Sequence, residues 1–310
     1  MGLRLPLRIG TRGSPLALAQ ATLVREGLAA LSPALVEPDA IMVEVIKTTG
    51  DRVTDRLLAD IGGKGLFTKE IEEALLGGTI DLAVHSMKDM PTWLPEGLVM
   101  AAMLPRADPR DALIADGVRS IAELPHGALV GTASLRRAAQ LLAARPDLRV
   151  TPLRGNVQTR LRKLAEGEVT ATFLAVAGLV RLGLKSVISA PLSPETMLPA
   201  AAQGAIGIEV RADDVAVLEL LAGIDHRVTS IRVAAERAFL AALEGSCRTP
   251  IAALAELEDQ EVRLRGLVAR PDGSDLRRIE RRGAVADAVA LGGDTGAELL
   301  AGLPAGFLAA

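Results

Sequence analysis

The chain has 310 residues, a formal net charge of −3 and 49% hydrophobic residues, which is typical of a globular protein with two or three domains. The acidic balance excludes a globally basic nucleic-acid binder, and five aromatic residues are too few for a protein that stacks many bases. One cysteine excludes an intrachain disulfide, and with three widely separated histidines it predicts no structural metal site.

The first part of the chain alternates predicted strands and helices. Ser14 followed by Pro15 is typical of a helix start, and Gly77-Gly78 of a helix end. In chain order we expect a strand at 5–10, a helix at 16–31, a strand at 41–47, a polar loop at 48–65, a helix at 66–76 and a strand at 79–84.

The same alternation returns further along the chain. The predicted strands are 128–131, 148–152, 171–176 and 205–210, and the predicted helices are 135–144, 156–165, 178–182 and 215–221. Strands that alternate with helices in this way predict α/β layers with crossover connections, in at least two lobes.

The C-terminal third has a different pattern. A long amphipathic helix at 227–243 precedes three short strands at 251–257, 261–269 and 276–281, with a Pro-Asp-Gly turn between the last two. A final helix at 284–303 is expected to be interrupted at Gly292-Gly293. This part therefore reads as a separate α+β domain that begins near residue 225.

No run without a charged residue exceeds 13 residues, whereas a membrane-spanning helix needs about 20. The N-terminal apolar stretch contains charges and does not read as a secretory signal. We therefore expect a cytoplasmic protein that contacts neither membrane nor nucleic acid.

Arginine is concentrated in one part of the chain. Of 29 arginines, seven lie with one lysine between Gly131 and Lys163, where there is a single acidic residue. Arg136 and Arg137 stand in the first turn of a predicted helix, and Arg154 lies at a strand-to-helix junction; both places favour anions. Guanidinium groups bind carboxylates and phosphates through two parallel hydrogen bonds. The alternative is a solvated charged face.

Two further signals concern single residues. Cys247 lies in a predicted loop beside Arg248, and a nearby cation favours the nucleophilic thiolate, although a lone cysteine is more often buried and inert. Lys88 and Asp89 follow a predicted buried strand, at the end where α/β sheets bind ligands. They form either a salt bridge or a catalytic carboxylate with a basic neighbour.

Seven segments in order resemble the porphobilinogen deaminase family, also called hydroxymethylbilane synthases. They are Thr-Arg-Gly-Ser-Pro-Leu-Ala (11–17), Gly-Gly-Lys-Gly-Leu-Phe (62–67), His-Ser-Met-Lys-Asp-Met-Pro (85–91), Ser-Leu-Arg-Arg (134–137), Leu-Arg-Gly-Asn-Val (153–157), Ala-Gly-Leu-Val-Arg-Leu-Gly (177–183) and Gln-Gly-Ala-Ile-Gly (203–207). The departures, among them Gln158, Ser246 and Arg248, concern loops and not the reacting groups.

The resemblance implies two periplasmic-binding-protein-like α/β lobes and a C-terminal α+β domain. Domain 1 would comprise residues 1–104 and 205–224, domain 2 residues 105–204, and domain 3 residues 225–310. It also implies a monomeric transferase of tetrapyrrole biosynthesis that joins four porphobilinogen molecules into hydroxymethylbilane and releases ammonia, on a dipyrromethane cofactor bound to Cys247 by a thioether.

The resemblance also implies roles for individual residues. Asp89 would be the catalytic carboxylate that stabilises the cation left when ammonia departs. The residues expected to bind the cofactor are Lys88, Ser134, Arg136, Arg137 and Arg154, besides Cys247. Those expected to bind substrate are Arg12, Ser14, Phe67, Arg160 and Arg181. The alternative function is a non-catalytic two-lobed binding protein for an anionic metabolite, which would leave Cys247 and the third domain unexplained.

Overall fold

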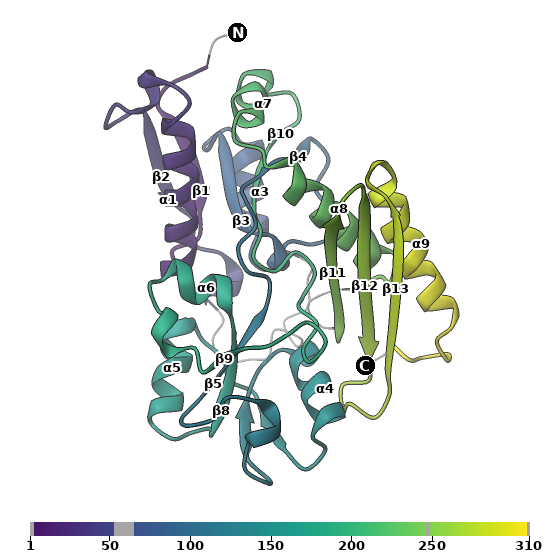
Figure 1. Cartoon of the computed structure of the whole chain (residues 1–310). Helices are drawn as coiled ribbons and strands as arrows, with labels where there is room; N and C mark the ends of the chain where they lie inside the picture. Colours follow the sequence, from purple (N-terminus) through teal and green to yellow (C-terminus); the bar gives the residue numbers. More distant parts are fainter. Residues whose placement is uncertain (1–2, 53–64, 246–248, 309–310) are drawn as a thin grey trace. The chain divides into compact units, whose positions relative to one another are not determined.

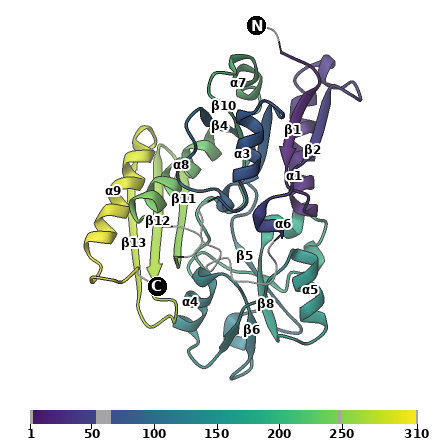
Figure 2. The same ribbon diagram turned by 180° about the vertical axis from the view of Figure 1, so that it is seen from behind.

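The computed structural model describes residues 3–52, 65–245 and 249–308. The chain divides into two compact units, one formed by Met1–Ala107 with Ala205–Ser230 and the other by Asp108–Gly204 with Ile231–Ala310 (Figures 1 and 2). The first unit therefore consists of two stretches that are distant in sequence. The boundaries of the three expected domains stay a prediction.

The first unit contains a five-stranded sheet with the strand order β2-β1-β3-β10-β4. Its elements are β1 (Leu7–Thr11), α1 (Pro15–Ala29), β2 (Ile41–Val45), α2 (Thr49–Arg52), α3 (Lys69–Leu76), β3 (Leu82–Ser86), β4 (Leu98–Met103), β10 (Ile206–Arg211) and α7 (Val215–Ala222). β1 runs parallel to β2 and β3, whereas β10 is antiparallel to β3 and β4. The carboxyl ends of β1 and β3 therefore meet at one edge of the sheet.

The second unit has a corresponding sheet with the order β7-β6-β8-β5-β9. Its elements are β5 (Asp111–Ala115), β6 (Leu129–Gly131), α4 (Leu135–Ala144), β7 (Arg149–Thr151), α5 (Val157–Ala165), β8 (Ala171–Ala175), α6 (Val176–Arg181) and β9 (Ala190–Pro191). β6 is parallel to β7 and β8, and β5 is antiparallel to β8. All five residues of β5, including Asp111, are buried.

A third sheet, β11-β12-β13, belongs to the same second unit. It is a meander of β11 (Ile251–Glu258), β12 (Glu261–Ala269) and β13 (Leu276–Ala284), accompanied by α8 (Arg227–Ala242) and α9 (Ala288–Ala301). One face packs against Phe239 of α8 and Leu299 of α9. The other face, with Leu254 and Leu267, packs against Ala139 of α4. The sheet therefore contributes apolar side chains to a core on each of its two faces.

Short 3-10 helices complete the chain at Pro33–Leu35, Met87–Asp89, Ile121–Glu123, Lys185–Val187 and Val285–Asp287. None of the helices in the described part of the chain combines the length and apolar character needed to cross a bilayer. The expected fold class, α/β lobes followed by an α+β segment, is confirmed.

Two expectations about elements were wrong. The polar stretch 48–65 begins with a short helix, Thr49–Arg52, while residues 53–64 lie outside the described residues. Gly292 does not interrupt the last helix, because α9 runs unbroken through it. A Cβ atom at Gly292 would stand 2.2 Å from the carbonyl oxygen of Ala235, so glycine there permits close packing of α9 on α8.

Candidate active site

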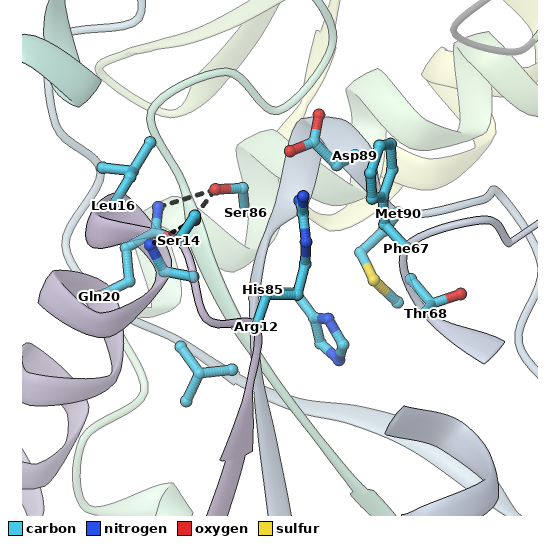
Figure 3. Close-up of a pocket in the computed structure, with 12 residues that line it drawn as sticks. Arg12, Ser14, Leu16, Gln20, Phe67, Thr68, His85, Ser86, Asp89 and Met90 are labelled. Atoms are coloured by element: carbon cyan, nitrogen blue, oxygen red, sulfur yellow. Dashed lines mark hydrogen bonds between the residues drawn. The ribbon is translucent and has the colours of Figure 1, made fainter. Parts of the chain in front are cut away.

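A pocket in the first unit brings together several of the predicted site residues. It lies at the carboxyl ends of β1 and β3, and its lining includes Arg12, Ser14, Phe67 and Asp89 (Figure 3). Arg12 follows β1, Ser14 precedes α1, and Asp89 ends the 3-10 helix after β3. Sequence positions far apart thus meet at the sheet edge where the strand order predicts a ligand site.

Arg12 is held by two neighbours of different kinds. Its guanidinium group donates to both carboxylate oxygens of Asp51 on α2, with Nε 3.2 and 3.1 Å from Oδ1 and Oδ2. The guanidinium carbon also lies 4.1 Å from the centre of the Phe67 ring. Burial alone would raise the pKa of Asp51, but hydrogen bonds from Arg12 and Thr48 hold it below its ordinary value. Asp51 was not among the residues predicted for the site.

Asp89 is exposed at the pocket. Of the residues that the structure describes, none forms an ion pair or hydrogen bond with its carboxylate. In Figure 3 this carboxylate and the guanidinium group of Arg12 point to the same side, and the imidazole of His85 points away from both. Asp89 is therefore available to a ligand, and a salt bridge with the described residues does not occupy it.

Ser14 has a local structural role. Its hydroxyl oxygen accepts a hydrogen bond from the backbone N–H of Ala17, 3.2 Å away, and so caps α1. Nearby, the side chains of Gln20 and Ser86 are joined by hydrogen bonds of 2.8 and 3.0 Å. Polar groups from α1 and β3 are thereby fixed against each other beside the pocket.

A cluster of buried titratable side chains lies beside the pocket. Nε2 of His85 is 2.9 Å from Oε2 of Glu209 on β10, and both side chains are buried. Glu72 on α3 is also buried. Burial raises the pKa of Glu72, and the negative charge of Glu209 acts in the same direction. These acidic residues had not been singled out from the sequence.

In the second unit, Arg136 and Arg137 share one buried carboxylate. Nη1 of Arg136 lies 2.7 Å from Oδ2 of Asp111, and Nη2 of Arg137 lies 2.6 Å from Oδ1. Burial would raise the pKa of Asp111, yet the two guanidinium groups hold it far below its ordinary value. Arg137 also donates to the carbonyl of Phe173, 2.7 Å away. Ser134 caps this helix by accepting from the N–H of Arg137 at 3.4 Å.

Two further predicted arginines of this unit, Arg154 and Arg181, each have a buried donor without a partner among the described residues. Arg154 is half-buried, and its Nη1 is a buried atom without a hydrogen-bond partner among the described residues. Arg181 donates from Nη2 to the carbonyl of Gly204 at 2.7 Å, while its buried Nε has no partner in the part of the chain that the structure describes. Burial lowers the pKa of Arg181 to about 10, so it remains a cation at neutral pH.

Three predicted residues remain to be placed. Arg160 lies on α5 and donates from Nε to the carbonyl of Gly155 at 2.8 Å. Lys88 is half-buried and precedes Asp89 in the 3-10 helix. Cys247 lies outside the described residues.

The arrangement favours ligands that carry several carboxylates. Arg154 and Arg181 each have one buried guanidinium donor without a described partner, and a carboxylate is a strong acceptor for such a donor. Asp89 offers a carboxylate that can stabilise positive charge or exchange a proton. Asp111 was not among the residues predicted for the site, although an acidic residue at the start of the apolar run Asp-Ala-Leu-Ile-Ala is a signal in the sequence.

Comparisons with known proteins agree with the resemblance found in the sequence. Residues 7–219 match the model of the porphobilinogen deaminase dipyromethane cofactor binding domain, and residues 230–301 match that of the porphobilinogen deaminase C-terminal domain.

Full-length relatives extend these matches. A porphobilinogen deaminase of Paracoccus denitrificans is 58% identical over 302 residues, which cover 97% of this chain and 96% of the relative. A chloroplastic porphobilinogen deaminase of Oryza sativa subsp. japonica is 54% identical over 304 residues, covering 97% and 85% of the two chains. Among solved structures, a putative methionine-binding lipoprotein of Bacillus subtilis aligns with a TM-score of 0.42 and 16% identity, over 70% of this chain and 89% of that one.

Proposed function

The chain belongs to the porphobilinogen deaminase family, and on this basis we propose that it joins four porphobilinogen molecules head to tail into the linear tetrapyrrole hydroxymethylbilane. One ammonia is released at each addition, and water releases the product. The observation that carries the proposal is the pair of family matches, which together extend over residues 7–219 and 230–301.

The residues present fit a dipyrromethane cofactor. This group carries acetate and propionate side chains, and the buried Nη1 of Arg154 lacks the acceptor that such a carboxylate would supply. Cys247 would hold the cofactor through a thioether, and Lys88, Ser134, Arg136, Arg137 and Arg154 would bind its side chains. When bound, the cofactor supplies the electron-rich α-carbon of its terminal pyrrole as the nucleophile.

Substrate binding follows the same chemistry. Each porphobilinogen brings two carboxylates, so the growing chain needs many cationic partners. Arg181, whose buried Nε is not bonded to any described residue, would bind one of these carboxylates. Arg12, Ser14 and Arg160 would bind others, and Phe67 would stack beside a pyrrole ring.

Asp89 would act at the step that releases ammonia. The carbon–nitrogen bond of the aminomethyl group breaks after its nitrogen is protonated, and the pyrrole is left as an electron-poor cation. The nucleophilic α-carbon that attacks this cation would form the new carbon–carbon bond and then lose its own proton. An exposed carboxylate without a described partner can stabilise the cation and accept that proton.

Intact-mass spectrometry tests the proposal most directly. The purified protein should exceed the mass of its sequence by two linked pyrrole units, turn pink-violet with Ehrlich's reagent, and release ammonia from porphobilinogen. Cys247→Ala should show none of the three. A protein that binds porphobilinogen without an adduct or ammonia release would instead be the non-catalytic binding protein.

The finer expectations of a monomer and of a cytoplasmic location are part of this proposal. Size-exclusion chromatography with light scattering tests the first, because a dimer would elute at twice the mass of 32.3 kDa. Cell fractionation tests the second.

A further inference from the structure

One short segment, Leu198–Gly204, is hydrogen-bonded to two of the predicted arginines and to the carboxylate of Asp111. The carbonyl of Leu198 accepts from Nη1 of Arg136 at 2.8 Å. The carbonyl of Gly204 accepts from Nη2 of Arg181 at 2.7 Å. Between them, the side-chain amide of Gln203 donates to Oδ1 of Asp111 at 3.0 Å, the oxygen that also receives Arg137. The conformation of this segment therefore affects Arg136 and Arg181 directly, and Arg137 through Asp111.

The backbone of the segment is unusual just before Gln203. Ala202 has a φ of +59°, in the left-handed region that residues with a Cβ rarely adopt, and Gly204 has a φ of +90°. Ala202 is buried, with 1% of its surface exposed. An outside contact is needed to keep an alanine in this conformation.

Glu236 of α8 provides that contact. Its side chain is fully buried, and Oε2 accepts the backbone N–H of Ala202. Oε1 accepts the N–H of Ala255 on β11 at 2.7 Å. Both carboxylate oxygens are thus committed to backbone donors, one from the segment and one from the C-terminal sheet. The helix that carries Glu236 ends at Ala242, shortly before Cys247 in the sequence.

We propose that Glu236 is a positioning residue for the carboxylate-binding arginines. It fixes the peptide of Ala202, and through it the side-chain amide of Gln203 and the carbonyl of Gly204. The amide orients Asp111, which binds Arg136 and Arg137, and the carbonyl orients Arg181. The carboxyl side chains of the cofactor and of the growing pyrrole chain then meet guanidinium groups that are already in place. This inference rests on the proposed function.

The variant Glu236→Gln tests it. Glutamine keeps the size but offers only one acceptor oxygen, so one of the two backbone N–H groups faces another donor. We expect the KM for porphobilinogen to rise at least threefold and the fraction of chains with the two-pyrrole adduct to fall, at a temperature where the variant is fully folded. The matched control is Glu298→Gln, an exposed carboxylate on α9 that pairs with Arg281, and it should change neither quantity.

A double-mutant cycle separates positioning from general stability. If Glu236 acts through Gly204 on Arg181, Glu236→Gln combined with Arg181→Lys should raise KM by less than the product of the two single effects. Should the two effects multiply, Glu236 does not act through Arg181, and the inference is wrong.

A second variant covers the case in which Glu236→Gln does not fold. Gln203→Met keeps the shape of the side chain and removes its donor to Asp111, so it should lower the adduct fraction while both arginines keep their carboxylate. Wild-type KM and adduct fraction in the folded variants would overturn the inference. A wild-type protein without adduct would instead overturn the proposed function.

Discussion

Asp111→Asn is expected to destabilise the second unit strongly. Asp111 is fully buried and receives Arg136, Arg137 and Gln203 on its two oxygens. Asparagine preserves the volume, but it removes the negative charge and turns a donor toward the guanidinium groups. Two arginines with about 6% of their side-chain surface exposed would then be left without a counter-charge.

The size of the effect follows from this geometry. Removing one partner of a buried ion pair costs about 3–5 kcal/mol, because the remaining charge is already cut off from water. For a folding unit of 150–250 residues this lowers the melting temperature by roughly 6–20 °C. The free energy of unfolding of a typical domain is about 5–15 kcal/mol, so this loss is a large part of it. The variant should therefore be close to its stability limit.

Stability against pH gives a second measurement of the same contact. The folded-state pKa of Asp111 lies below its ordinary value of 3.8, so its contribution is complete above that value and is lost as the pH falls through the folded pKa. The difference in melting temperature between wild type and Asp111→Asn should thus be constant from about pH 5 to 7 and shrink below about pH 4.

Calorimetric melting and urea titration of both proteins would measure these differences, with Glu298→Gln as control. The exposed pair of Glu298 with Arg281 should contribute less than about 1 kcal/mol. Two results would refute the idea that this carboxylate neutralises buried charge. One is a melting temperature of Asp111→Asn equal to that of the control variant. The other is a difference in melting temperature from wild type that stays the same at low pH.

Three other variants address the proposed chemistry. Asp89→Asn should reduce turnover about 10²- to 10³-fold and leave the melting temperature unchanged, because the carboxylate is exposed. The melting temperature and the steady-state rate are measured on one preparation. Normal turnover with a lower melting temperature would give Asp89 a structural role. Cys247→Ala should have the mass of the bare sequence and no activity, and an adduct on it would contradict the assignment. Arg181→Lys should raise KM by roughly 10- to 100-fold, the loss of one charge-assisted hydrogen bond, with partial chains visible on native gels; an unchanged KM would show that Arg181 does not bind substrate.

Local signals in the sequence predicted local structure well. Ser14 was expected to begin a helix, and it caps α1 by accepting a hydrogen bond from the backbone N–H three residues further on. The Pro-Asp-Gly turn joins β12 and β13, and Gly273 there has a φ of +75°. These predictions succeed because a capping or turn residue acts on backbone groups within its own few positions.

Contacts between distant positions were not predictable in this way. The density of arginines indicated an anion site, but nothing near Arg136 in the sequence points to Asp111, 25 positions earlier, as its partner. The same limit applies to Gly292, which was expected to interrupt the last helix. Its role depends on Ala235 of another helix. The sequence alone does not distinguish a glycine that interrupts a helix from one that lets two helices pack closely. For the same reason, the sequence could not identify Glu236 as a ligand of the Ala202 backbone.

The C-terminal sheet, covered on both faces, also limits how the chain can be dissected. The sequence pattern predicts that the segment after residue 225 is a separate domain that could be expressed alone. However, Leu254 and Leu267 face α4, which lies in the preceding stretch of the chain. An excised fragment would present that apolar face to water and invite self-association. Exchange of this segment between relatives should therefore succeed only when the matching face of α4 travels with it.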